Sequence, residues 1–168
     1  YPNIQAGINA AADGDTVLVG PGVYSGAGNR DLDFGGRSMS LISSGGAEST
    51  FIDCSDAGRG FYLHSGEPTE ALIQGFTVEH ASSPQGGGLR VEDGAGVTVR
   101  WCVFRDNTTT YGGGGVSCWY AGDVVLEDVT FFHNRGGSGG AAYALHTDFL
   151  TVDRCQFVDN RGTYTGGL

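Results

Sequence analysis

Apolar and polar residues alternate over short stretches of this chain, for example in Val97-Thr98-Val99 and Leu150-Thr151-Val152. A period of two is typical of β-strands with one buried face. Glycine clusters and polar turns separate the stretches, and the segments between them are too short for a crossover helix. The pattern therefore predicts an all-β chain made of short strands.

The alternating stretches recur in copies that end in the letters FRDN, FFHN and FVDN, 26 to 27 residues apart. When these endings are aligned, the remaining apolar positions fall into columns as well. The aligned aromatic and amide positions are Phe104, Phe131, Phe157, Asn107, Asn134 and Asn160. A repeat of this length, made only of strands and turns, predicts a solenoid in which like residues stack at about 4.8 Å.

The repeat predicts one domain over residues 1–168 with about six coils. We expect shorter initial coils over residues 16–62 and regular coils of 26 to 27 residues over 63–168. Leu168 stands where a further coil would begin, so the chain is expected to be a C-terminally truncated fragment of a larger protein.

One helix is predicted over residues 3–13, before the first strand. Asn3 can cap it, Ile4, Ile8 and Ala11 share one face, and Gly14 is expected to stop it. Such a helix would cover the first coil, whose open strand edges would otherwise invite association.

The aligned asparagines predict an internal ladder, since a buried amide without partners costs a few kcal/mol and stacked amides can bond to one another. The aligned phenylalanines would stack beside it. The alternative is that the three asparagines occupy independent turns and tolerate a left-handed backbone.

The amino-acid composition excludes some classes of binding partner. The chain has a net charge of −10, and its nine basic residues are all arginine, so no basic stripe is available for nucleic acid. Polyanionic ligands are also disfavoured unless a metal ion mediates. No stretch is long and apolar enough for a transmembrane span. Among the four cysteines, Cys102 and Cys155 lie two coils apart in the aligned columns, which predicts free thiols instead of a disulfide.

Two segments resemble known families. The opening IQAGINAAADGDTVLVGPGVY is similar to the first coil of right-handed parallel β-helix proteins of the pectin lyase-like group. The GGL, GGV and GGA motifs, with their FRDN, FFHN and FVDN endings, resemble the GGA and FxxN repeats of bacterial polymorphic outer membrane proteins. The resemblance implies a right-handed parallel β-helix in a secreted or cell-surface (outer membrane) bacterial protein. These groups include polysaccharide lyases, hydrolases, epimerases and adhesins, so the fold does not select a function.

Catalytic members of the pectin lyase-like group are expected to use acidic residues on an outward face, often with calcium, and an arginine or lysine base. Two outward columns offer candidates. One contains Gln74, Arg100, Glu127 and Asp153, and the other contains His80, Asp106, His133 and Asp159. In the first column the carboxylates could share a cation such as calcium or raise each other's pKa. The alternatives are a charge ladder on a solvated face and ordinary turn residues.

A third set of residues could bind a ligand without catalysing a reaction. Trp119, Tyr120, Tyr143 and His146 follow the glycine motifs and could form a strip on which sugars stack. The alternative is that they are isolated surface aromatics.

These observations favour a non-catalytic, secreted or cell-surface β-helix segment with a structural or adhesive role, binding a polysaccharide or cell-surface glycan. A fragment of a polysaccharide lyase or epimerase is one alternative. A solenoid that self-associates through its C-terminal end, as a dimer or filament, is the other.

Overall fold

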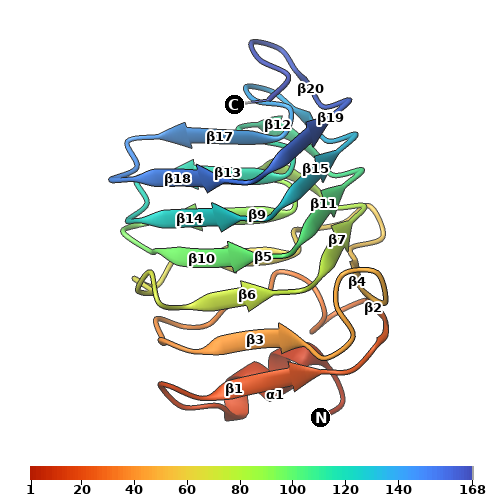
Figure 1. Cartoon of the computed structure of the whole chain (residues 1–168), viewed down its shortest axis with the longest axis vertical. Helices are drawn as coiled ribbons and strands as arrows, with labels where there is room; N and C mark the ends of the chain where they lie inside the picture. Colours follow the sequence, from red (N-terminus) through yellow and green to blue (C-terminus); the bar gives the residue numbers. More distant parts are fainter. Residues whose placement is uncertain (168) are drawn as a thin grey trace.

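A computed structural model describes residues 1–167 and shows a stack of parallel coils with the helix at the N-terminal end (Figure 1). The strands form four sheets, and the register pairings between strands are parallel. Sheet 1 contains β1 (Thr16–Val19), β3 (Ser40–Ser43), β6 (Leu72–Gln74), β10 (Val97–Arg100), β14 (Val124–Glu127) and β18 (Leu150–Asp153). Sheet 2 contains β2 (Gly22–Ser25), β4 (Thr50–Asp53), β7 (Thr77–Glu79), β11 (Val103–Arg105), β15 (Thr130–Phe132) and β19 (Gln156–Val158).

The two smaller sheets complete each coil. Sheet 3 contains β8 (Ser82–Gln85), β12 (Thr108–Tyr111), β16 (Arg135–Gly136) and β20 (Arg161–Gly162). Sheet 4 contains β5 (Phe61–Leu63), β9 (Leu89–Glu92), β13 (Val116–Trp119) and β17 (Ala142–Leu145). A regular coil therefore visits sheets 4, 1, 2 and 3 in turn, as β9 to β12 do. The solenoid of about six turns predicted from the repeat is confirmed.

Alternation of side chains fills the interior of the solenoid. In β14, for example, Val124 and Leu126 are fully buried and Val125 points outward. The largest buried side chains are Phe34, Phe61, Phe76, Phe104 and Phe131. Parallel pairing stacks each inward residue on its equivalent in the next coil, so one continuous core runs along the axis.

Residues with a left-handed backbone make the corners between sheets. In one coil these are Trp101, Asp106 and Tyr120, with φ values of 49°, 54° and 48°. Each lies directly after a strand and turns the chain toward the next sheet. A left-handed conformation costs about 1 kcal/mol or more in a residue with a Cβ, and Asp, Asn and His adopt it more readily than most.

The expectation of shorter initial coils is wrong for one step. Leu41 pairs with Ile73, and the chain between these partners is longer than that between Val99 and its partner Leu126. The reason is that Leu63 lies in sheet 4, where it pairs with Val91, and so does not continue the column of Leu41 in sheet 1. The first coil pairs with sheet 4 through a single bridge, from Leu32 to Phe61. The regular spacing of apolar residues is therefore lost in this part of the sequence.

The helix α1 (Ile4–Ala10) is shorter than the predicted 3–13. The Asn3 side chain accepts a hydrogen bond from the Ala6 amide at 2.8 Å, and Ile4 and Ile8 are buried against the first coil. The helix stops before Gly14 because Ala11 is already extended, at φ −83° and ψ 151°. Arg37 Nη1 donates to the carbonyl oxygens of Ile8 and Ala11 at 2.9 and 2.7 Å and so satisfies the end of the helix.

All four cysteines are free in the described chain. Burial raises the pKa of Cys102 to about 11 and that of Cys118 to about 12, as expected for thiols that serve as small hydrophobic residues. No helix within residues 1–167 is long and apolar enough to cross a membrane.

Candidate functional site

The three aligned asparagines form a ladder under the corner between sheets 2 and 3. Asn107 Nδ2 donates to Asn134 Oδ1 at 3.1 Å, and Asn134 Nδ2 donates to Asn160 Oδ1 at 3.0 Å. Each amide group also donates to a backbone carbonyl of the preceding coil, as Asn134 does to Phe104 at 2.8 Å. The rings of Phe104, Phe131 and Phe157 stack beside the ladder with centroids 5.6 and 5.2 Å apart. This interior support fixes the positions of the side chains on the outer side of the corner.

The residues that precede the ladder all have a left-handed backbone, with φ values of 54°, 54° and 51° for Asp106, His133 and Asp159. The structure brings the three side chains together. His133 Nδ1 lies 3.8 Å from Asp106 Oδ1, and its Nε2 lies 3.6 Å from Asp159 Oδ2. With Arg135 and Arg161 they line a polar depression. The imidazole therefore stands between two carboxylates, one from each neighbouring coil.

This triad is open to solvent, because the side chains of Asp106, His133 and Asp159 are 43%, 47% and 73% exposed. A carboxylic acid that must donate a proton near neutral pH needs a raised pKa, which usually comes from burial. The carboxylates of this triad have no burial of that kind. The arrangement thus fits polar contacts to a ligand better than general acid catalysis.

The column with Arg100, Glu127 and Asp153 is occupied by ion pairs. Arg100 Nε lies 2.5 Å from Glu127 Oε2. Arg154, which we had not considered, reaches Glu127 Oε1 at 2.9 Å and also pairs with Asp153 and with Asp128. The position between the two predicted carboxylates is therefore filled by a guanidinium, and these residues do not fit a shared calcium ion.

The pKa expectation is wrong in sign for Glu127. Hydrogen bonds from Arg154 and then Arg100 lower the pKa of Glu127, and those from Arg154 lower the pKa of the neighbouring Asp128. Glu127 faces arginine cations, which favour its charged form, whereas the prediction considered only its repulsion by Asp153. The surface here is a charge ladder.

Acid should weaken this ladder. Because the folded pKa values of Glu127 and Asp128 are depressed, their contribution to stability is present above the unfolded pKa values and is lost as pH falls through the folded ones. We expect Arg154→Gln to lower the thermal midpoint slightly near neutral pH, with the difference from the native chain vanishing between about pH 5 and pH 2. Thermal unfolding followed by circular dichroism across this range measures it. Arg135→Gln, which removes an arginine without a salt bridge among residues 1–167, is the control; a constant pH-independent difference for Arg154→Gln would contradict the ladder.

The four residues of the proposed aromatic strip form two contacting pairs, each across two adjacent coils. Trp119 and Tyr143 have ring centroids 6.0 Å apart on sheet 4, and Tyr120 and His146 stack at 4.8 Å on the following corner. Tyr120 is 60% exposed. Each pair therefore joins one aromatic ring to a ring of the next coil.

Charged residues lie beside this strip, because Arg90 pairs with Ser117 and Glu92 pairs with Trp119 in the neighbouring strand. Arg90 lies under Trp119, with its Cζ 5.6 Å from the ring centroid, and Arg90 Nε donates to Glu92 Oε2 at 2.9 Å. Glu92 also accepts from the Tyr62 hydroxyl. The contact between Tyr62 and Glu92 was not predicted from the sequence. It requires the register in which Phe61 is aligned with Leu89 and Tyr62 with Arg90.

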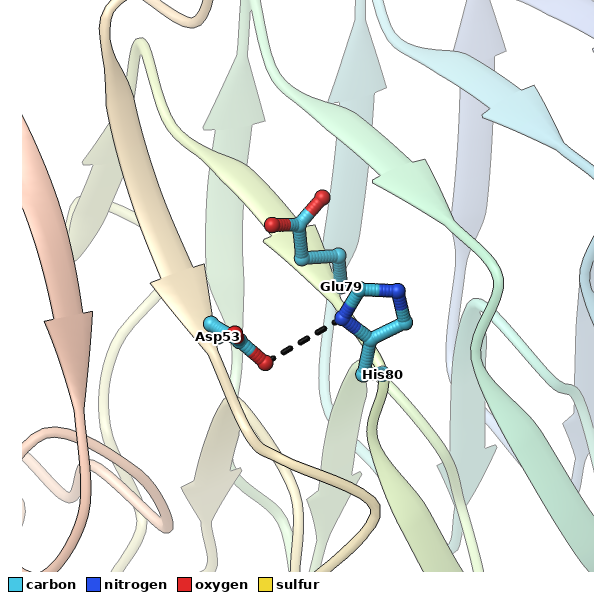
Figure 2. A group of neighbouring side chains, drawn as sticks. All are labelled: Asp53, Glu79 and His80. Atoms are coloured by element: carbon cyan, nitrogen blue, oxygen red, sulfur yellow. Dashed lines mark hydrogen bonds and ion pairs between the residues drawn. The ribbon is translucent and has the colours of Figure 1, made fainter.

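A further group lies toward the N-terminus on the corner between sheets 2 and 3, and the sequence pointed only to its member His80. Asp53 and Glu79 end the paired strands β4 and β7, and His80 follows Glu79 (Figure 2). His80 Nδ1 lies 3.2 Å from Asp53 Oδ1. Aligning the letters FID of residues 51–53 with TVE of residues 77–79 would have placed the two carboxylates in one column.

Comparisons with known proteins agree with this architecture. Residues 40–166 match the model of the right handed beta helix region. The chain is also similar to mouse SHC SH2 domain-binding protein 1, with 28% identity over 153 residues that cover 82% of this chain and 22% of that protein. The chain thus spans about a fifth of the length of this relative. No solved structure gives a significant match. Because the family model covers well over half of the sequence, the chain belongs to the right-handed beta helix family.

Proposed function

We propose that this chain is a non-catalytic, adhesive β-helix segment of a secreted or cell-surface bacterial protein, and that it binds glycan through its aromatic strip. The observation that carries the proposal is the pairing of Trp119 with Tyr143 and of Tyr120 with His146 in successive coils. Aromatic rings present a flat apolar face together with a polar edge, which suits the two faces of a sugar ring.

Stacking on aromatic rings provides few hydrogen bonds, and a charged residue beside the strip can provide them. Glu92 lies on the same sheet, next to Trp119, and offers a hydrogen-bond acceptor to sugar hydroxyls, while the buried Arg90 holds the Glu92 carboxylate in place. Repetition from coil to coil, at about 4.8 Å, favours an extended ligand over a small molecule because neighbouring sites can hold successive parts of one chain.

The mouse relative is named as a protein that binds an SH2 domain, which supports a binding role for this type of solenoid. An SH2 domain is a protein and not a glycan, so binding of a protein ligand is the alternative outcome of the experiment below. It gives no support to an enzymatic role.

A carbohydrate-active enzyme is the second candidate, and the triad of Asp106, His133 and Asp159 is the observation that favours it. Because the side chains of this triad are exposed to solvent, we rank the enzyme below the glycan-binding segment. An enzyme would need a buried acid or a metal-activated water, and the sheet 1 carboxylates are held by arginines.

A binding and turnover screen against neutral and acidic polysaccharides tests the proposal. We expect binding without product, and loss of at least about tenfold in affinity in Trp119→Ala, since each stacked ring contributes about 0.5 to 1.5 kcal/mol beyond its buried area. Trp101→Ala is the matched control, because Trp101 is exposed but lies on the corner between sheets 1 and 2. New reducing ends or unsaturated products that vanish in His133→Asn would favour the enzyme. Equal binding by both tryptophan variants would contradict the strip, and light scattering on the same samples identifies self-association.

A further inference from the structure

Three potential metal ligands from two successive coils converge on the outer side of the corner between sheets 2 and 3 (Figure 2). One ligand atom from each of Asp53, Glu79 and His80 lies within 4.8 Å of the other two. Strand register holds Asp53 beside Glu79, and the left-handed backbone of His80, at φ 53°, turns its ring back toward Asp53. The convergence is therefore built by the backbone.

The spacing of these atoms suits a transition metal. Donors at about 2.0 to 2.1 Å around a tetrahedral ion are about 3.3 Å apart, and His80 Nδ1 already lies 3.2 Å from Asp53 Oδ1. Asp53 Oδ1 is held in place by the Ser55 amide at 2.9 Å. One imidazole nitrogen with two carboxylates is a donor set that zinc and its neighbours accept and that calcium, which prefers oxygen alone, does not favour.

A separate observation comes from Glu79, whose side chain is only 9% exposed. Its Oε2 accepts a hydrogen bond from Arg105 Nε at 2.6 Å, whereas Oε1 accepts none within residues 1–167. Arg105 therefore holds one oxygen of the carboxylate and leaves Oε1 available to a cation.

We propose that Asp53, Glu79 and His80 bind a divalent transition-metal ion of the zinc type, which joins two successive coils. Water completes the coordination on the solvent side. Arg105 competes for Glu79 and therefore sets the affinity of the site. This inference is independent of the glycan proposal, because neither residue set nor measurement is shared.

Titration of the chelator-treated chain with Zn²⁺ in a calorimeter, with Ca²⁺ and Mg²⁺ as comparisons, tests the site. We expect one Zn²⁺ per chain, a rise in thermal midpoint, and at least about tenfold weaker binding in His80→Asn and Glu79→Gln. Asparagine tolerates the left-handed backbone at this position, so His80→Asn should fold. His133→Asn, the same change on an equivalent corner two coils away, should bind within about twofold of the native chain.

Arg105→Met provides a result that general surface binding would not give. Methionine keeps an apolar stem against Phe51, over which the Arg105 guanidinium lies at 5.6 Å, but removes the competing charge. We expect Zn²⁺ to bind several-fold more tightly to this variant. Unchanged Zn²⁺ affinity in His80→Asn would overturn the site, because the ion would then reside elsewhere, for example at the partly exposed Cys155 thiol. Equal loss in His80→Asn and His133→Asn would overturn it as well.

Discussion

Replacing Phe131 by alanine is expected to lower the free energy of unfolding by about 4 kcal/mol, the usual range for a buried phenylalanine. Its ring is fully buried and stacks between Phe104 and Phe157, at interplanar angles of 13° and 10°. Truncation removes both stacking contacts and leaves a cavity in the middle of the core, where the paired backbones on either side cannot close. Thermal and urea unfolding measure the loss.

Phe132→Ala is the matched control for this prediction. Phe132 is the next residue of β15 and points outward, where it contacts the ring of His133. The same chemical change should cost less than about 1 kcal/mol there. Similar losses for the two variants would contradict the inward stack.

Replacing Asn134 by alanine is expected to cost about 3 kcal/mol, which for a chain of this size lowers the thermal midpoint by about 6 to 12 °C. Asn134 Oδ1 accepts from both the backbone and the side-chain amide of Asn107, at 3.2 and 3.1 Å. Its Nδ2 donates to the Phe104 carbonyl at 2.8 Å. Alanine leaves these buried groups without partners, and no water can replace the lost amide at a fully buried position.

The neighbouring His133→Asn serves as the control, since His133 is exposed and its backbone conformation suits asparagine. Its unfolding free energy should lie within about 0.5 kcal/mol of the native value. If Asn134→Ala were equally mild, the asparagines would be independent turn residues, which was the alternative interpretation of the repeat.

The candidate surface could be predicted only where the repeat is regular. Asp106, His133 and Asp159 were placed in one column from the FRDN, FFHN and FVDN endings, and the structure brings them within contact distance. Asp53 and Glu79 were missed because the first coils vary in length and hide the register.

The sequence also could not predict which side chains from neighbouring coils contact one another. Glu127 and Asp153 were correctly placed in adjacent coils, yet the guanidinium of Arg154 reverses the expected pKa shift of Glu127. Arg154 follows Asp153 at a left-handed corner, at φ 49°, and this conformation directs its long side chain back over the preceding coil. Such a reach depends on backbone dihedrals that residue spacing does not specify.

The sequence by itself determined the solenoid, its core columns and the asparagine ladder. Parallel stacking repeats one chemical environment in every coil, so a position's role is written several times and can be read without coordinates. The tertiary structure alone decided which charges neutralise one another, where the helix ends and how the early coils join. These features depend on contacts between residues that occupy non-equivalent positions, as Arg37 does with Ile8 and Arg105 with Glu79, and no repeat encodes them.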